Sequence, residues 1–349
     1  MTAALLLCAY ALIVAWSASV LLTPLTSRGI SARLGLTAWL TAMASVLVCL
    51  MTALVFLVRA AVASWPGLAA DVCRSVAGQA CTPLVYRGVF EFGLSAVALV
   101  ATVTATVLAW RYGRHVQRAQ QGTRAHAEAA RLTGRRLPGI PGFPAGPAVV
   151  LDSPQRVAYC VPGRPAAIVL STGALAILDP SQLTAVLAHE RAHLAGRHHL
   201  LIAATRGLAA TFPAVPIFTR GPAEVARLAE MCADDVAARS SGRNTLVTAL
   251  LAMGTGIAVP AVALAASTCA VQARVQRLLE PPRRGRRARY SLALAGVTLA
   301  LVSGMLAVFR LLPVGRSAYP DRWVSRPGGR AGLVRSGEEG PGSTGQGGR

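Results

Sequence analysis

Residues 183–199, LTAVLAHERAHLAGRHH, decide the fold, because they contain the pentad HERAH at residues 189–193. On a helix, residues four apart share a face, so the rings of His189 and His193 can reach one metal ion. Glu190 lies one step round the helix and borders the same position. This spacing is typical of a catalytic zinc site, although two histidines four apart can also lie on a solvated helix face.

A catalytic zinc takes three protein ligands and leaves the fourth position for water, so the pentad alone is not enough. Pro222 opens a helical stretch in which Glu230 and Asp234 are four apart and share a face. We predict that Glu230 is the carboxylate ligand and that Asp234 accepts the other ring N–H of a liganding histidine. Glu190 would then take a proton from the bound water. Alternatively, Asp234 and Asp235 are surface charges, since acidic pairs are common on helices.

Short apolar segments before the motif helix predict three strands, at residues 148–151, 157–161 and 166–171, the last two joined by a hairpin turn. The sequence DPSQ at residues 179–182 combines an N-cap, a proline at the first helical position and a glutamine three residues after the cap. The motif helix should begin there and end near the histidines 198–199. Residues 166–171 either belong to the core or form an exposed edge strand that pairs with an extended peptide substrate.

The composition predicts an integral membrane protein. Only 14% of the 349 residues are charged, and the mean hydropathy is +0.51. Several apolar runs with little or no charge are long enough to cross a bilayer as helices, at about residues 3–22, 34–58, 89–110 and 290–311. We therefore predict an α-rich polytopic membrane protein with about four transmembrane helices and a separate α+β unit at residues 148–285.

Arginine supplies all of the basic charge and marks the predicted cytoplasmic side. The formal net charge is +21, from 35 basic residues, none of them lysine, against 14 acidic ones. Arginines cluster at residues 111–136 and 283–289, beside apolar runs, which is the positive-inside pattern. We expect the lipid bilayer as a partner and no direct nucleic-acid binding, because no basic recognition helix, zinc knuckle or aromatic platform is recognisable.

This charge pattern also gives the domain organisation. Residues 111–147, an arginine-rich segment that ends in a Pro/Gly linker, and the α+β unit should be cytoplasmic, whereas residues 312–349 should be a disordered extracytoplasmic tail. Two further apolar stretches, residues 200–218 and 244–272, could be buried helices or could enter the membrane. Because the arginines at 283–289 must return to the cytoplasm, both cross or neither does, and we favour neither crossing fully.

The cysteines offer one candidate disulfide. Residues 59–88 should form a polar loop outside the cell, where disulfides persist. Cys73 and Cys81 both lie in this loop and could pair, although their separation alone does not show it.

The order of these motifs resembles that of the antirepressor-type membrane zinc metallopeptidases. These are relatives of the bacterial beta-lactam-sensing signal transducers, with HtpX-like and CAAX-type proteases as more distant relatives. The motifs that carry the resemblance are VLSTGAL at 169–175, LDPSQLTAVLAHERAHL at 178–194, EMCAD at 230–234 and RVQRLL at 274–279.

The resemblance implies that residues 148–285 form a cytoplasmic, zincin-like metallopeptidase domain. It implies that His189, His193 and Glu230 bind zinc, with Glu190 as the catalytic base. By the same resemblance, Asp234 supports a zinc ligand. It also implies that Arg274 and Arg277 either maintain the packing of the active unit or hold a carbonyl oxygen near the metal.

The resemblance further implies that the substrate is a protein or peptide, with regulatory cleavage of a transcriptional repressor as the favoured role. A quality-control protease of the membrane and a non-catalytic, zinc-containing signalling protein are the alternatives. The chain departs from the family in two ways. Family members often carry an aspartate where this chain has His198. The tail after the last span has no Ser-x-x-Lys motif, so we do not expect this chain to sense beta-lactams.

Overall fold

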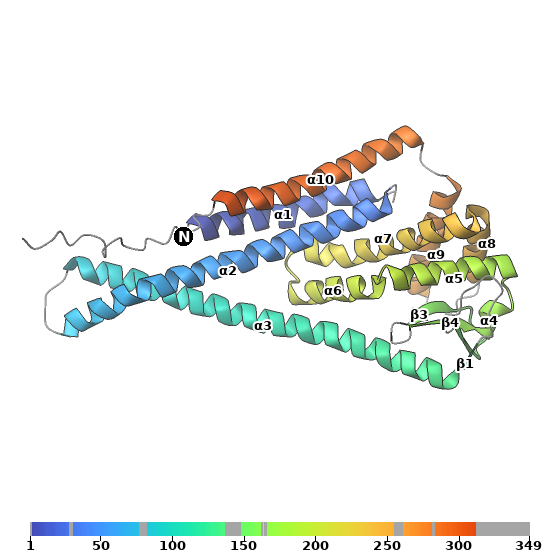
Figure 1. The fold of residues 1–349 in the computed structure, drawn as a ribbon, viewed down its shortest axis with the longest axis horizontal. Coiled ribbons are helices and arrows are strands. Elements are labelled where there is room, and N and C mark those ends of the chain that lie inside the picture. The colour runs from blue at the N-terminus through green and yellow to red at the C-terminus, as the bar shows by residue number, and fades with distance from the viewer. Residues whose placement is uncertain are drawn as a thin grey trace, which may run out of the picture. The chain divides into compact units, whose positions relative to one another are not determined.

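The computed structural model describes residues 2–27, 31–76, 82–136, 148–161, 163, 166–254, 261–280 and 283–311. Within these ranges the chain is mostly helical, with a single four-stranded sheet (Figure 1). The predicted linker at 137–147 and the predicted tail at 312–349 lie outside the described residues, as do Cys81 and the side chain of Cys73. The predicted disulfide is therefore untested.

Among the described residues, four helices are long and apolar enough to cross a membrane, which supports a multi-pass membrane protein. They are α1 (Thr2–Thr26), α2 (Ala32–Val76), α3 (Thr82–Thr133) and α10 (Arg284–Leu311). Helices α1 and α10 both pack against α2 (Figure 1). The Tyr10 hydroxyl of α1 donates a 2.7 Å hydrogen bond to the Leu301 carbonyl of α10, which joins the first and last of these helices.

Two helix boundaries differ from the sequence prediction. The segment 59–88 was expected to be an external loop, but α2 continues to Val76 and α3 begins at Thr82, so most of it is helical. Helix α3 also continues through the arginine-rich segment as far as Thr133. Alanine, arginine and glutamine dominate that segment, and these residues favour helix strongly enough to extend it beyond the apolar run.

The two ambiguous apolar stretches are divided into shorter helices. Helix α6 (His198–Thr211) has 14 residues, which is only about 21 Å at 1.5 Å per residue and short of a bilayer core. It is separated by residues 212–215 from α7 (Pro216–Ser241), and α8 (Arg243–Gly254) is shorter still, with 12 residues. Neither α6 nor α8 has spanning length. In the second stretch, residues 255–260 lie outside the described residues and α9 (Ala261–Leu279) follows them, so the prediction that neither stretch crosses fully is supported for 200–218 and stays a prediction for 244–272.

The sheet has the strand order β1-β2-β4-β3, with β1 (Arg135–Arg136), β2 (Ala148–Leu151), β3 (Ala158–Val161) and β4 (Ala167–Ser171). Strands β3 and β4 are antiparallel, which confirms the predicted hairpin, and β2 and β4 are parallel. Of the two alternatives for residues 166–171, the core position is correct and the exposed edge is wrong. Every residue of β4 is buried, which agrees with the apolar run AIVL at 167–170, and β4 lies between β2 and the edge strand β3.

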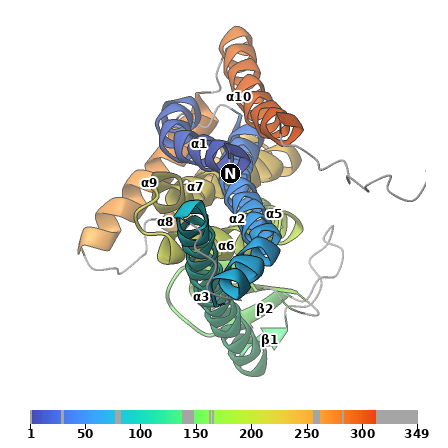
Figure 2. The ribbon, with the colours of Figure 1, turned by 90° about the vertical axis from the view of Figure 1, so that its left-hand side faces the viewer.

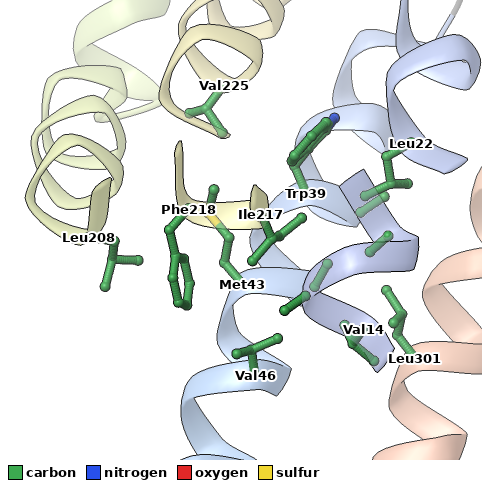
Figure 3. Packing of buried hydrophobic residues seen from close by; sticks show 14 of the residues in the cluster. Val14, Leu22, Trp39, Met43, Val46, Leu208, Ile217, Phe218, Val225 and Leu301 are labelled. Atoms are coloured by element: carbon green, nitrogen blue, oxygen red, sulfur yellow. The ribbon is translucent and has the colours of Figure 1, made fainter. Parts of the chain in front are cut away.

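Two apolar clusters position the helices that matter for the site. The larger cluster joins α1 and α2 to the first half of α7, where Ile217 and Phe218 lie against Met43 (Figure 3). The smaller packs α5 (Pro180–Ala195) on the sheet through Leu187 and Leu170. Helix α3 reaches the same region and contacts β2 and β3 (Figure 2).

Candidate metal centre

Helix α5 begins where the sequence predicts. The Asp179 side chain accepts hydrogen bonds from the backbone N–H groups of Ser181 and Gln182, at 2.8 and 2.9 Å. The Gln182 side chain accepts one in return from the Asp179 N–H, at 3.1 Å, and Pro180 occupies the first turn. This capping box fixes the start of the helix and therefore the face on which the pentad lies.

The three predicted ligands come together between α5 and α7, which run side by side (Figure 1). The Nε2 atoms of His189 and His193 are 3.1 Å apart. Glu230 on α7 places one carboxylate oxygen 3.3 Å from His189 Nε2 and the other 3.4 Å from His193 Nε2. Two imidazole nitrogens and a carboxylate therefore point at one place.

These distances fit a zinc ion. Zinc bonds of about 2.0–2.2 Å in tetrahedral geometry separate the donor atoms by about 3.3 Å. The two imidazole nitrogens are 3.1 Å apart, and each has an oxygen of Glu230 at 3.3 or 3.4 Å. Each pairwise distance is thus close to this value, although the two histidines face different oxygens of the carboxylate. Neutral imidazole and carboxylate are also the donors that zinc takes in catalytic sites with three protein ligands.

Asp234 stands behind His189 and is completely buried, so it is not a surface charge. Its Oδ1 lies 3.2 Å from His189 Nδ1, although the ring N–H is not aligned well enough for a hydrogen bond. Arg274, on α9 (Ala261–Leu279), donates to both carboxylate oxygens, from Nε at 2.8 Å and from Nη2 at 2.6 Å. Burial alone would raise the pKa of Asp234, but the hydrogen bonds from Arg274 lower it below its usual value. The carboxyl group is therefore ionised inside the protein.

The two predicted arginines occupy different positions. Arg274 Nη1 is also 3.0 Å from a Glu230 oxygen, so its guanidinium borders the ligand cluster. Arg277, one turn further along α9, donates to both oxygens of Asp235, at 2.8 and 2.9 Å. Asp235 is partly exposed, so its pairing with Arg277 fastens α9 to α7 near the surface.

The pKa values of the two carboxyl groups Glu190 and Glu230 are shifted in opposite directions. Burial raises the pKa of Glu190, and the neighbouring histidines only partly oppose this. Burial also acts to raise the pKa of Glu230, but the hydrogen bonds from His189 and His193 and the charge of Arg274 lower it strongly. For His189, burial acts to lower the pKa, yet the two carboxylates of Glu230 and Asp234 raise it to about 9. A proton and a metal ion therefore compete for this ring.

A cavity of about 590 Å³ opens onto these side chains. His189, Glu190, His193 and Glu230 line one side of it, and residues 157–160 on and beside the edge strand β3 line another. The backbone of Cys160 acts on the Glu190 carboxylate, where it lowers the pKa slightly against the effect of burial. The edge strand and the proton-accepting carboxylate thus share one cavity.

Sequence reasoning missed the position of His198. It was expected near the exposed end of the motif helix, but its side chain is buried, and its Nδ1 lies 3.0 Å from His193 Nδ1. The spacing of the pentad could not reveal this contact, because a turn at residues 196–197 ends α5 before His198 begins α6.

The fold and the site together define a class: a mostly helical protein with four candidate membrane helices and a His-His-Glu cluster suited to a metal ion. Residues 121–220 match the family model of Peptidase family M48. The matched region includes the pentad and ends before Glu230, and the match supports the M48 metallopeptidase family, whose members are metal-dependent. No curated protein matches the chain.

Proposed function

We propose that the protein is a membrane-bound zinc endopeptidase that hydrolyses peptide bonds in cytoplasmic or membrane-proximal proteins. The observation that carries this proposal is the donor triangle of His189, His193 and Glu230 beside Glu190. The pairwise contacts of 3.1–3.4 Å are close to the donor separations of a zinc site, and the residues that match the metallopeptidase family include the pentad. A zinc ion held there would polarise water and the substrate carbonyl.

Each charged side chain then has a task. Glu190 takes a proton from the attacking water and passes it to the leaving amine, for which a carboxylate with a raised pKa is well matched. Asp234, held by Arg274, keeps the ring of His189 in place. Arg274 also lies close enough to the site to steady an oxygen of the substrate, as the family resemblance implies.

The substrate would bind as an extended peptide along the outer edge of β3, which pairs with no second strand among the described residues. Strand β3 is hydrogen-bonded to β4 on one side, so an added strand can pair only on the opposite side. Residues 157–160, on and beside β3, line the cavity that holds Glu190. The role first assigned to residues 166–171 therefore moves to the neighbouring strand. Because pairing uses backbone groups, this surface would accept many sequences in extended form.

The location and biological role rest on charge and resemblance. Arginines at 111–136 and 283–289 favour a cytoplasmic domain, which suits cleavage of a transcriptional repressor. Quality control of membrane proteins is the alternative role. A non-catalytic signalling protein would have no need for Glu190 beside a complete ligand set.

Replacement of Glu190 tests the mechanism. Glu190→Gln should bind zinc in the same amount as the wild type and should lose peptide cleavage by at least about 100-fold, since the metal ligands remain and the proton acceptor does not. His193→Ala should lose the metal itself, and removal of zinc with a chelator should stop cleavage until zinc is returned. Cleavage by Glu190→Gln at the wild-type rate would refute the mechanism.

The same variant separates the biological roles. Glu190→Gln should retain bound substrates, which can be identified after purification. Recovery of one DNA-binding repressor would support regulation, whereas a mixture of damaged membrane proteins would support quality control.

A further inference from the structure

The turn between α5 and α6 is built around His198. Arg197 has φ 48° and ψ 36°, and among the described residues it is the only non-glycine with positive φ. This left-handed conformation is unfavourable for a residue with a Cβ atom, so something in the folded state must hold it. This residue separates α5 from α6 and sets the direction in which the side chain of His198 leaves the backbone.

Gly196 leaves the space that the His198 ring occupies. A Cβ atom at position 196 would collide with Nε2 of His198 and would lie 2.7 Å from its Cδ2. Any other residue at position 196 would therefore push the ring away. Both residues of the turn thus serve the placement of one side chain.

The placed side chain meets a predicted zinc ligand. His198 is only 5% exposed. Its Nδ1 atom lies 3.0 Å from Nδ1 of His193. The two rings meet edge to face, with centroids 4.8 Å apart and an interplanar angle of 89°. His193 is therefore held from the side opposite to its Nε2.

The direction of this hydrogen bond follows from the metal site. His193 Nε2 faces the other donors, 3.1 Å from His189 Nε2, so its lone pair must be free for a metal. The proton of the neutral ring is then on Nδ1, and only an acceptor can face it. His198 can accept through Nδ1 when its own proton is on Nε2.

We infer that His198 is a positioning residue for the zinc site, which accepts the Nδ1 proton of His193 and fixes the orientation of that ring. This inference rests on the proposed function. Partners of this kind fix the tautomer of a metal ligand, and their loss typically weakens metal binding by about 10- to 100-fold.

Zinc affinity of the full-length protein tests the inference. His198→Leu removes the acceptor at similar size, whereas His198→Asn keeps an acceptor where Nδ1 stood. We expect zinc to bind about 10- to 100-fold more weakly to His198→Leu and with nearly wild-type affinity to His198→Asn. The measurement is competition with a chromogenic chelator, and the absorption spectrum of the cobalt-substituted protein reports ligand geometry independently of activity.

Two further variants keep the test decisive. His199→Leu, which changes the neighbouring imidazole, should leave affinity and the cobalt spectrum unchanged. Gly196→Ala should weaken zinc binding as His198→Leu does, even if the leucine variant fails to fold. Wild-type affinity in His198→Leu, or equal losses in the leucine and asparagine variants, would overturn the inference. If the wild type itself binds no zinc, the proposed function fails instead.

Discussion

The two halves of α7 are held in different ways. In the first half, Ile217, Phe218 and Leu228 are fully buried apolar side chains packed against α1 and α2 (Figure 3). In the second half, Glu230 and Asp234 are fixed by charged and hydrogen-bonded partners on α5 and α9. One helix of 26 residues thus joins the packed core of the candidate membrane helices to the ligand cluster.

This difference indicates which half of α7 should tolerate substitutions. Apolar packing is non-directional and adjusts to small changes of shape. A buried ion pair tolerates no change of charge, because the remaining partner keeps its full desolvation cost. The smallest possible chemical change in each half of α7 should therefore have very different effects.

The largest effect is expected for Asp234→Asn, which keeps the shape and removes the charge. Arg274 would be left buried without its bidentate partner, at a cost of about 3–5 kcal/mol in the free energy of unfolding. Thermal or denaturant unfolding in detergent measures this loss. Adding Arg274→Met should recover part of it, and a stability equal to the wild type in the single variant would contradict this account.

A much smaller loss is expected for Ile217→Val in the first half of α7. The change removes one methyl group from a fully buried side chain, which costs about 0.5–1.5 kcal/mol in unfolding free energy. Zinc content should not change, since no ligand moves. A loss as large as that of Asp234→Asn would show that the packed half is no more tolerant than the ionic half.

The smallest effect is expected for Asp235→Asn, the matched control for Asp234→Asn. Its side chain is 31% exposed where it pairs with Arg277, so water screens the remaining charge, and the expected cost is at most about 1 kcal/mol. The same unfolding measurement decides whether burial or the mere presence of an arginine partner governs the cost on α7.

The parts of the fold that sequence predicted well depend on local chemistry. The start of α5 follows from the cap at Asp179, and the convergence of Glu230 with the pentad follows from helical spacing on two adjacent helices. The apolar runs likewise indicate the four long helices. The cap and the apolar runs are decided by residues within a few turns of one another. The meeting of Glu230 with the pentad also needs the packing of α5 against α7, which helical spacing permits but does not decide.

The features that sequence missed depend on distant pairing or on strain. Whether β4 is central or at the edge is decided by β2, which joins it from beyond the hairpin. The helical extension over residues 59–76 runs through Pro66 and Gly67, a pair that in a sequence usually marks a turn. The burial of His198 depends on the left-handed backbone conformation of Arg197. An arginine in a sequence does not predict this conformation.

Helix α3 has a mechanical consequence. Its 52 residues form one unbroken helix of about 78 Å, more than twice the roughly 30 Å core of a bilayer. Because the helix is continuous, the direction in which the side chains of its apolar part face is fixed relative to the face that contacts the sheet. A single inserted residue would rotate one end relative to the other by about 100°. The number of residues in α3 therefore sets the orientation of the sheet relative to the apolar part of the helix.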